Sequence, residues 1–434
     1  MAPHGSPLDP SGAGRAVTEP RPVCMIVHAY YEEDARVRRE AEALVAAGRP
    51  VDVYALRRAA DGPEDEIDGV KLNRLPVIRH QGASLLTYLV EYLAFMLRAG
   101  VAAWRGHRRR SYAVAQVHTL PDFLVLAALP LRLAGVPVVL DLHEAMPEFF
   151  RSRFRPLANP LVHAVLVAQE RMAIRLADAV ITVNHALADR LVRSGVPAAK
   201  ITVVLNAPAL ARFDPDRHER RAFMADGVLR LVYAGALTPI YELDVLLEAI
   251  ALLAKQRPDL RLELDLYGRG DLREALGRQA ERLGIADRVH LRGRIPLEAV
   301  AAAIARADVG VAPTRRDAFT DVSLSTKIFE YAVMDKPVVA SRLPTVERYF
   351  PLDTLATYAP GDPADLAAVL TRLVDDPNER AERQARTESR LRKLAWHREV
   401  ERYVALIEGL ARDPAARPAA IEAVPGSLPE ARES

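Results

Sequence analysis

Cysteine is nearly absent from this 434-residue sequence, which contains only Cys24. A single thiol cannot form an intrachain disulfide, and it also excludes a metal site built from several cysteines. Cys24 stands in an apolar run that is typical of a strand. We therefore predict a buried and unreactive thiol rather than a nucleophile.

The sequence also lacks an excess of either charge. It has 59 basic and 57 acidic residues, and its formal net charge is +2. This balance gives no electrostatic reason to expect a nucleic-acid partner. The acidic residues do not show the ordered spacing of a divalent-cation site, so no metal is expected.

The two ends of the sequence have compositions that do not favour folding. Residues 1–20 are rich in Gly, Pro and Ser and contain no apolar segment of the kind found in secretory signals, and residues 412–434 are rich in Ala, Pro and Glu. Because such segments cannot bury enough apolar surface, we predict a disordered leader and a disordered tail.

Between these ends, short apolar runs alternate with amphipathic helical patterns. Strands are predicted at 23–28, 50–56, 70–75, 113–118, 136–142, 180–183 and 201–205, and again at 229–234, 260–267, 289–291, 307–313 and from 338 onward. Such alternation produces parallel sheets covered by helices on both faces. The predicted fold class is therefore α/β, with two doubly wound Rossmann-like domains, 21–207 and 228–387, that are joined by a linker at 208–227 and face a cleft.

The segment 317–341 follows the predicted strand 307–313 and contains the strongest candidate site. A polar loop leads into a helix predicted at 327–334, with Ser and Thr residues at 323, 325 and 326 as candidate N-caps. Lys327 and Glu330 share one face at the start of this helix, where the helix dipole also favours an anion. They could be an ordinary surface ion pair, or they could bind a ligand that carries phosphates and sugar hydroxyls.

The residues around this helix resemble the donor-binding signature of retaining, nucleotide-sugar-dependent glycosyltransferases of the two-Rossmann-domain (GT-B) type, family 4-like. The matching runs are Ser-Thr-Lys at 325–327, Phe-Glu-Tyr at 329–331 and Lys-Pro-Val-Val-Ala-Ser at 336–341, and similarity covers most of 22–407. The resemblance implies that the C-terminal domain binds a nucleoside diphosphate sugar and that the N-terminal domain holds the acceptor. It further implies that a helix at 388–411 packs back on the N-terminal domain, and that the reaction needs neither a metal nor a cofactor.

The resemblance also assigns roles at the start of the helix. Lys327 becomes the principal cation for the donor diphosphate, with Ser325 and Thr326 beside it, and Glu330 binds the ribose. Preorganised donors at these positions would stabilise the charge that develops on the departing diphosphate. The family's other glutamate, eight positions earlier, is absent, and Asp321 is a shifted substitute for it.

The remaining donor-side candidates follow strands of the second domain. Gly235 and Gly268 end two of these strands, and Arg269 follows the second glycine. Many family members carry two cations shortly after the first glycine, but this sequence has Ala there and then Tyr241. Arg294 matches a position that commonly holds the edge of the nucleobase. Arg269 and Arg294 could equally be solvated surface arginines.

Three histidines follow strands of the first domain, where a doubly wound sheet binds its ligands. They are His28, His118 and His143, and Glu144 follows the last of them. Histidine can both hydrogen-bond a sugar hydroxyl and carry a proton near neutral pH. The family resemblance favours His118, His143 and Glu144 as active-site residues. Each histidine taken alone could be structural.

The sequence therefore predicts a cytoplasmic hexosyltransferase-type enzyme that acts on a glycan or lipid-linked acceptor in cell-envelope or exopolysaccharide synthesis. Two alternatives remain open: a catalytically silent nucleotide-sugar or glycan-binding subunit, since two cations and one glutamate are missing, or a sugar-nucleotide epimerase of the same fold. Residues 85–104 form a nearly continuous apolar segment followed by arginines. This segment is either a buried crossover helix or an amphipathic helix on the inner face of the cytoplasmic membrane.

Overall fold

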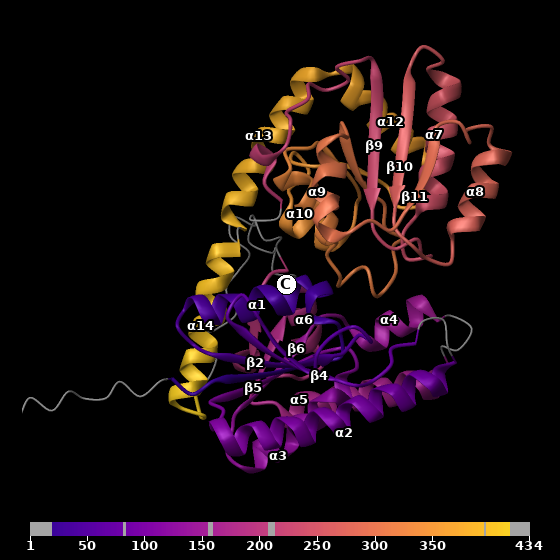
Figure 1. Ribbon diagram of the computed structural model, residues 1–434. Coiled ribbons are helices and arrows are strands. Elements are labelled where there is room, and N and C mark those ends of the chain that lie inside the picture. The colour runs from indigo at the N-terminus through magenta and orange to yellow at the C-terminus, as the bar shows by residue number, and fades with distance from the viewer. Residues whose placement is uncertain (1–19, 81–83, 155–158, 207–212, 395, 417–434) are drawn as a thin grey trace, which may run out of the picture.

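The computed structural model describes residues 20–80, 84–154, 159–206, 213–394 and 396–416. The chain forms two α/β lobes, one above the other in Figure 1, and each lobe has its own sheet. Nearly all of the leader and most of the tail lie outside the described residues. Residue 412 ends a helix rather than beginning a disordered segment.

The first lobe is built on an eight-stranded sheet in the order β3-β4-β2-β1-β5-β6-β7-β8. Its strands are β1 Val23–Val27, β2 Val51–Leu56, β3 Glu64–Ile67, β4 Val70–Leu75, β5 Val114–His118, β6 Val138–Leu142, β7 Ala179–Thr182 and β8 Ile201–Val203. All neighbouring strands are parallel except β3, which pairs antiparallel with β4. The order reverses between β1 and β5, which marks the switch point where such sheets bind ligands.

The second lobe has a six-stranded parallel sheet in the order β11-β10-β9-β12-β13-β14. Its strands are β9 Val228–Ala234, β10 Arg261–Tyr267, β11 Val289–Gly293, β12 Val309–Ala312, β13 Val338–Ser341 and β14 Ala356–Tyr358. This is the Rossmann strand order, with its switch point between β9 and β12. Two doubly wound domains are therefore confirmed.

Helices cover both faces of each sheet. In the first lobe they are α1 Ala35–Ala46, α2 Leu85–Arg110, α3 Leu129–Leu133, α4 Met146–Arg153, α5 Pro160–Leu176 and α6 His185–Arg193, with 3-10 helices η1 Tyr31–Glu33, η2 Asp122–Ala128 and η4 Ala198–Lys200. In the second they are η5 Pro215–Arg217, α7 Leu243–Gln256, α8 Arg273–Arg282, α9 Leu297–Ala305, α10 Thr326–Val333, α11 Pro344–Tyr349, α12 Pro363–Asp375 and α13 Pro377–Lys393. The last helix is α14 Trp396–Arg412.

Helices α13 and α14 run down the side of both lobes (Figure 1). α14 packs on the first lobe, where Tyr403 and Ile407 are fully buried in the same apolar cluster as β1 and α1. The Tyr403 hydroxyl donates to Oε1 of Gln116 on β5 at 2.7 Å, and Glu399 accepts from the backbone N–H of Leu205 at 2.8 Å. The C-terminal segment thus ties the second lobe to the core of the first.

Two features differ from the sequence-based expectations. The strands β3 and β14 are additional to the expected ones. The β3 sequence Glu-Asp-Glu-Ile is polar, mostly exposed and without apolar alternation, and β14 is only three residues long, Ala-Thr-Tyr. Residues 85–104 do form a crossover helix, but α2 is not buried all round. It is the one helix in the described part of the chain that is long and apolar enough to cross a membrane, and only 22% of its most apolar window is buried.

Candidate functional site

The loop 313–325, between β12 and α10, is fixed by both lobes. Within the loop, Oδ1 of Asp317 accepts hydrogen bonds from two backbone N–H groups at 2.9 and 3.0 Å. From the first lobe, the Ser152 hydroxyl donates to Oδ2 of Asp317 at 2.6 Å, and Nδ2 of Asn184 donates to the carbonyl of Val322 at 3.0 Å. Because four such bonds define its path, the loop presents the start of α10 in one orientation.

Lys327 lies in the first turn of α10 and is only 7% exposed. Its Nζ is 3.9 Å from the ring centroid of Tyr241 and 5.3 Å from that of Tyr233. No described residue forms an ion pair with it. Ser325 occupies the N-cap position, but its side chain caps no backbone N–H, and its buried hydroxyl has no hydrogen-bond partner among the described residues. A buried cation and an unpartnered hydroxyl at a helix start form a site for an anion.

Gly235, at the end of β9, leaves room for the lysine stem. A Cβ at this position would lie 2.1 Å from Cε and 2.8 Å from Nζ of Lys327. We expect Gly235→Ala to fold normally, because a flexible side chain can move aside, but to displace the ammonium from its place over Tyr241. Calorimetric titration with a nucleoside diphosphate should then show about 10-fold weaker binding. Gly277→Ala, whose Cβ would meet its nearest atom at 3.6 Å, is the control. Equal affinity in both variants would contradict this role.

A cavity of about 360 Å³ lies between the lobes and brings Lys327 and Glu330 together. The second lobe also contributes Ser325, Thr326 and Tyr241, three of the donor-site candidates, to its lining. The first lobe contributes His143, Glu144 and the polar residues of α1 and its N-cap, which include Asp34, Arg36, Arg38 and Arg39. Cations from both lobes therefore face one cavity. From the sequence, Lys327 of the second lobe was the principal cation expected there, and no cation of the first lobe was expected.

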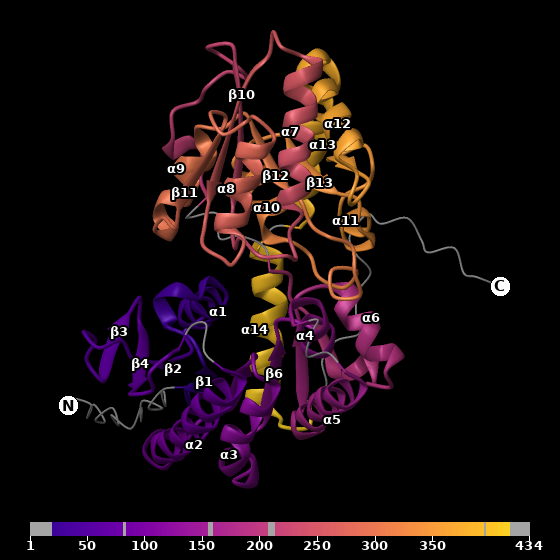
Figure 2. The same cartoon turned by 90° about the vertical axis from the view of Figure 1, so that its right-hand side faces the viewer.

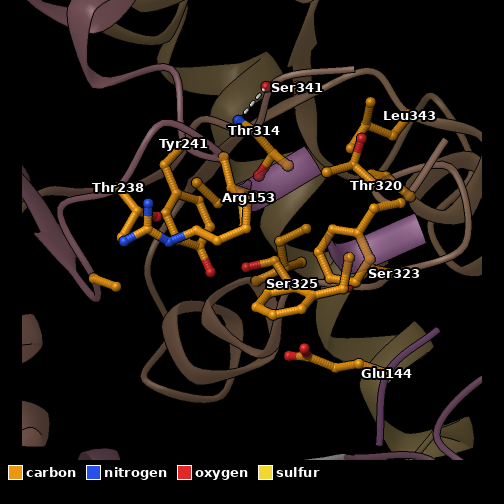
Figure 3. A pocket seen from close by; sticks show the side chains of 17 residues that line it. Glu144, Arg153, Thr238, Tyr241, Thr314, Thr320, Ser323, Ser325, Ser341 and Leu343 are labelled. Carbon is orange, nitrogen blue, oxygen red and sulfur yellow. Dashed lines mark hydrogen bonds between the residues drawn. The ribbon is translucent and has the colours of Figure 1, made fainter. Parts of the chain in front are cut away.

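A second cavity of about 270 Å³ adjoins the first, and the two share Glu144, Tyr241, Ser323 and Ser325. It is rich in hydroxyl groups, as Figure 3 shows. Its hydroxyl-bearing residues include Thr238, Thr314, Thr320 and Ser341. Phe149 of α4 and Phe319 add an apolar wall, with ring centroids 5.3 Å apart. Hydroxyl groups beside aromatic rings suit a sugar or nucleoside.

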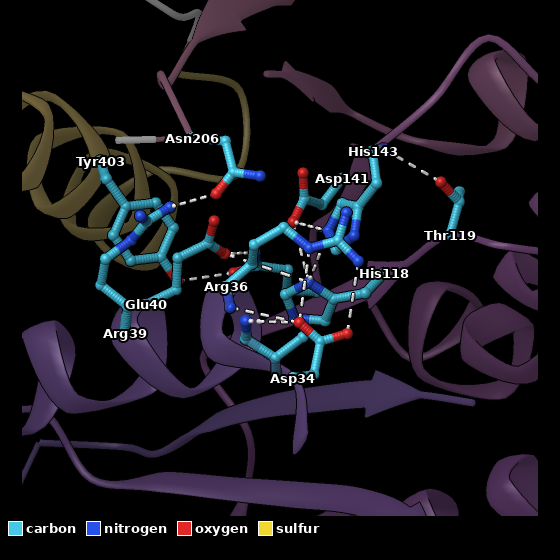
Figure 4. Close-up of polar contacts among 12 residues, drawn as sticks. Asp34, Arg36, Arg39, Glu40, His118, Thr119, Asp141, His143, Asn206 and Tyr403 are labelled. Carbon is cyan, nitrogen blue, oxygen red and sulfur yellow. Dashed lines mark hydrogen bonds and ion pairs between the residues drawn. The ribbon is translucent and has the colours of Figure 1, made fainter. Parts of the chain in front are cut away.

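On the first lobe, Asp141 connects two of the predicted histidines (Figure 4). Its Oδ2 lies 2.8 Å from Nδ1 of His118 and 2.7 Å from Nε2 of His143. His118 and Asp141 are paired residues of the neighbouring strands β5 and β6. If both rings donate to the carboxylate, Asp141 fixes the tautomer of each, with the lone pairs on His118 Nε2 and His143 Nδ1. Neither of these two atoms has a hydrogen-bond partner in the described structure.

The pKa values of Asp141, His143 and Glu144 are shifted in different directions. Burial raises the pKa of Asp141 by itself, but the two imidazoles outweigh it and hold this pKa well below its usual range. Burial, followed by the nearby Arg36 guanidinium, lowers the pKa of His143, so the imidazole is neutral at neutral pH. Burial raises the pKa of the Glu144 carboxyl, and Arg36 offsets only part of this. A neutral imidazole and a carboxyl with a raised pKa are suited to proton transfer.

His118, Asp141 and His143 also form the one cluster among the described residues whose side-chain atoms could hold a metal ion, since these atoms lie within 4.8 Å of one another. However, the Asp141 oxygen is at hydrogen-bond distance from both nitrogens. Two ligands of one zinc ion would lie about 3.3 Å apart, given bonds of about 2.0 Å in tetrahedral geometry. The spacing is therefore that of a hydrogen-bonded triad, and the absence of a metal requirement stays a prediction.

Several predicted residues do not line either cavity. Arg269 is exposed, and Nη2 of Arg294 forms an ion pair with Glu33 of the first lobe at 3.4 Å. Asp321 faces Arg316, with 3.4 Å between Oδ1 and Nε. His118 is fully buried behind Asp141.

His28 is also buried away from the cavities. Its Nε2 is 3.1 Å from Oε1 of Glu91 on α2, and burial lowers its pKa to about 4. This histidine supports packing between β1 and α2.

Four residues of the site were not selected as candidates from the sequence. Asp34 caps α1 by accepting from the N–H groups of Arg36 and Val37 at 3.2 and 3.4 Å. Nη2 of Arg39 donates to Oδ1 of Asn206 at 3.2 Å, and its guanidinium stacks on Trp396. Asp34, Arg36, Arg39 and Asn206 all line the larger cavity. Asp34, Arg36 and Arg39 belong to the run Asp-Ala-Arg-Val-Arg-Arg-Glu at 34–40, and Asn206 ends the run Val-Val-Leu-Asn at 203–206. Both runs lie within the span 22–407 that resembles the family, and this resemblance is the available signal.

Two Rossmann-like domains with a polar cavity between them define the GT-B architecture of glycosyltransferases. Sucrose-phosphate synthase from Thermosynechococcus elongatus has this fold, with a TM-score of 0.70 and 18% identity over 90% of this chain and 99% of its own. Anabaena HepE in complex with UDP-glucose has a TM-score of 0.67 and 14% identity over 89% of this chain and 99% of its own.

The sequence comparisons give the family. Residues 34–207 match the glycosyl transferase 4-like domain, and residues 229–376 match glycosyl transferases group 1. D-inositol 3-phosphate glycosyltransferase of Thermomonospora curvata is 28% identical over 94% of each chain. Glycogen synthase of Mycobacterium tuberculosis H37Rv is 28% identical over 79% of this chain and 82% of its own. The chain belongs to the GT-B glycosyltransferases, with a family 4-like N-terminal domain and a group 1 C-terminal domain.

Proposed function

We propose that this glycosyltransferase transfers a sugar, with retention, from a nucleoside diphosphate donor on the second lobe to an acceptor held by the first. The observation that carries the proposal is Lys327, a buried ammonium without an ion-pair partner among the described residues, beside the unpartnered Ser325 hydroxyl at the start of α10. The donor diphosphate supplies the missing negative charge. Glu330, one turn further on and lining the same cavity, binds the ribose.

The transition state places extra negative charge on the departing diphosphate. Lys327, the Ser325 hydroxyl and the first N–H groups of α10 are fixed before the reaction begins, so they can stabilise this charge without reorganisation. Arg36 from α1 adds a cation on the opposite wall of the cavity. This arrangement substitutes for the two cations that the family usually carries after Gly235, and no metal is required in this proposal.

The acceptor binds on the side of His143 and Glu144. Nδ1 of His143 accepts a hydrogen bond from the acceptor hydroxyl and takes up its proton as the bond to the sugar forms and the bond between sugar and diphosphate breaks. The Glu144 carboxyl lines both cavities and hydrogen-bonds the acceptor beside it. His118 does not reach the cavity and acts as a positioning residue through Asp141.

The acceptor we propose is a glycan or a lipid-linked sugar of cell-envelope or exopolysaccharide synthesis, used by an enzyme in the cytoplasm. Named relatives differ in this respect, since one is called an inositol 3-phosphate glycosyltransferase and another a glycogen synthase. Several similar structures contain UDP or a UDP-sugar, so UDP-glucose is the first donor to test.

Calorimetric titration with UDP, GDP and ADP tests the donor site. We expect one nucleotide to bind, and Lys327→Ala to bind it about 10- to 100-fold more weakly, because a charge-assisted contact to phosphate is lost. Lys255→Ala, which removes an exposed lysine from α7 of the same lobe, should leave the affinity unchanged.

Release of the nucleoside diphosphate from its sugar, measured in the same samples, separates an enzyme from a binding subunit. Turnover by the wild type that is lost in Lys327→Ala supports the transferase. Binding of the sugar nucleotide without turnover in the presence of acceptor extracts would favour the silent binding subunit. A folded protein that binds none of the three nucleotides would refute the donor site.

A further inference from the structure

Helix α2 exposes an apolar stripe on the side opposite to its packed face. Seven large apolar side chains on it are between 37% and 69% exposed: Leu86, Leu89, Val90, Leu93, Leu97, Val101 and Trp104. Their spacing of three and four residues places them on one face of the helix. The residues that pack inward, Phe95, Ala99 and Ala103, are fully buried. The stripe therefore lies on the surface, and its apolar side chains are not needed to pack the helix on the sheet.

Helix α5 exposes a similar stripe. Leu161 is 74% and Val165 57% exposed, and Ala164 and Ala168 lie exposed on the same face. α2 and α5 both pack against η2. Figures 1 and 2 show α2, α3 and α5 together on the side of the first lobe that is turned away from the second. We call the exposed sides of α2 and α5 the α2–α5 face.

Arginines occupy the C-terminal ends of both stripes. On α2 these are Arg105, Arg108 and Arg109, and on α5 they are Arg171 and Arg175, all exposed. None of these five side chains forms an ion pair with a described residue. Each helix contains a single acidic residue, Glu91 on α2 and Glu170 on α5, and both are buried. The α2–α5 face thus combines exposed apolar groups and unpaired positive charge with no exposed carboxylate.

We propose that the α2–α5 face docks on an anionic lipid bilayer, with both helices lying in the plane of the interface. Apolar side chains enter the boundary of the acyl chains, and the arginines contact lipid phosphates. A second copy of the chain fits less well, because the same face would offer the arginines no negative partner. This inference goes beyond the transferase proposal and does not depend on it.

The topology decides against a membrane-spanning α2. The helix connects β4 to β5, and both strands belong to one sheet. A span across about 30 Å of hydrocarbon would separate its ends to opposite sides of the membrane and break this sheet. Docking also connects the bilayer to the active site, since α4, whose Phe149 and Arg153 line the smaller cavity, contacts α5.

Vesicle flotation tests the docking without any sugar nucleotide, so its outcome is independent of the donor site. We expect the full chain to float with vesicles of phosphatidylcholine and phosphatidylglycerol in a roughly two-to-one ratio, and not with phosphatidylcholine alone. The triple variant Arg105→Ala, Arg108→Ala, Arg109→Ala should partition about 100-fold more weakly. Raising the salt concentration should also weaken the binding of the wild type to these vesicles, because salt screens the attraction between arginines and lipid phosphates.

The apolar part of the face is tested by Leu97→Glu combined with Leu161→Glu. Leu352→Glu, which changes a side chain 57% exposed between α11 and β14 of the second lobe, is the matched control. All three positions are exposed, so each variant should fold, which the thermal unfolding midpoint checks. The proposal predicts loss of flotation in the double variant and none in the control. The proposal is overturned if the wild type does not bind vesicles or if the double variant floats like the control. It is also overturned if the wild type binds no vesicles but sediments as a dimer that the double variant dissociates, because the face would then be an interface between two copies.

Discussion

Replacing Gly268 with Ala should lower the stability of the second lobe by about 3 kcal/mol or more, and its unfolding temperature by roughly 6–12 °C. Gly268 follows β10 with a φ of +149°, a conformation that residues with a Cβ rarely adopt. A Cβ here would lie 1.8 Å from the carbonyl oxygen of Gly235, which is backbone and cannot rotate away. Relief of the clash must separate the ends of β9 and β10, and Gly235 would move with respect to Lys327.

Thermal unfolding by circular dichroism and titration with the nucleoside diphosphate measure the two consequences, and both stability and affinity should fall. Gly284→Ala provides the control, because Gly284 also has a positive φ of +69° but would place its Cβ in open space. That variant should lose only about 1 kcal/mol and keep its affinity. Equal losses of stability in the two variants would show that the contact with Gly235 is unimportant.

The fold was predictable because its signals are local. Runs of β-branched residues gave most strands to within two residues, as for β2, observed at Val51–Leu56 against a prediction of 50–56. The repeated alternation of strand and helix then required parallel sheets. The edge strand β3 escaped prediction because its residues Glu64–Ile67 are exposed and polar, and it is stabilised by pairing with β4 rather than by burial.

The candidate site was predictable only where its residues are close in sequence. Lys327 and Glu330 are one turn apart on α10, so their common face followed from helical spacing. The link between His118 and His143 runs through Asp141, and it depends on the register of β5 against β6, which the sequence alone does not fix. The cations of α1 reach the same cavity only because the two lobes face each other.

Asp122→Asn should remove a large pH dependence of stability from the first lobe. Asp122 opens η2, is fully buried, and has no hydrogen-bond partner for either carboxylate oxygen among the described residues. The cation whose charge acts on it, Arg190, instead pairs with Glu148 and Glu170. Burial raises the pKa of Asp122 to about 8, and the Glu170 charge adds to this. The carboxyl therefore stays protonated in the folded chain at neutral pH.

The sign of the effect follows from this raised pKa. Between about pH 4 and pH 8 the folded state keeps a proton that the unfolded state has released, so the free energy of unfolding falls as the pH rises and levels off above pH 8. The amide that Asp122→Asn introduces does not ionise in this range. Relative to the variant, the wild type should thus lose about 3 to 4 kcal/mol between pH 5 and pH 8.

Urea unfolding followed by tryptophan fluorescence measures this difference, because both tryptophans of the sequence report on the first lobe. Trp396 packs against its core, and Trp104 lies on its helix α2. Asp287→Asn, at an exposed position of the second lobe, should show no such trend. The free energies of unfolding of wild type and Asp122→Asn could instead differ by the same amount at pH 5 and at pH 8. This result would mean that the buried carboxyl is already ionised at pH 5, with a counter-charge that the described structure does not contain.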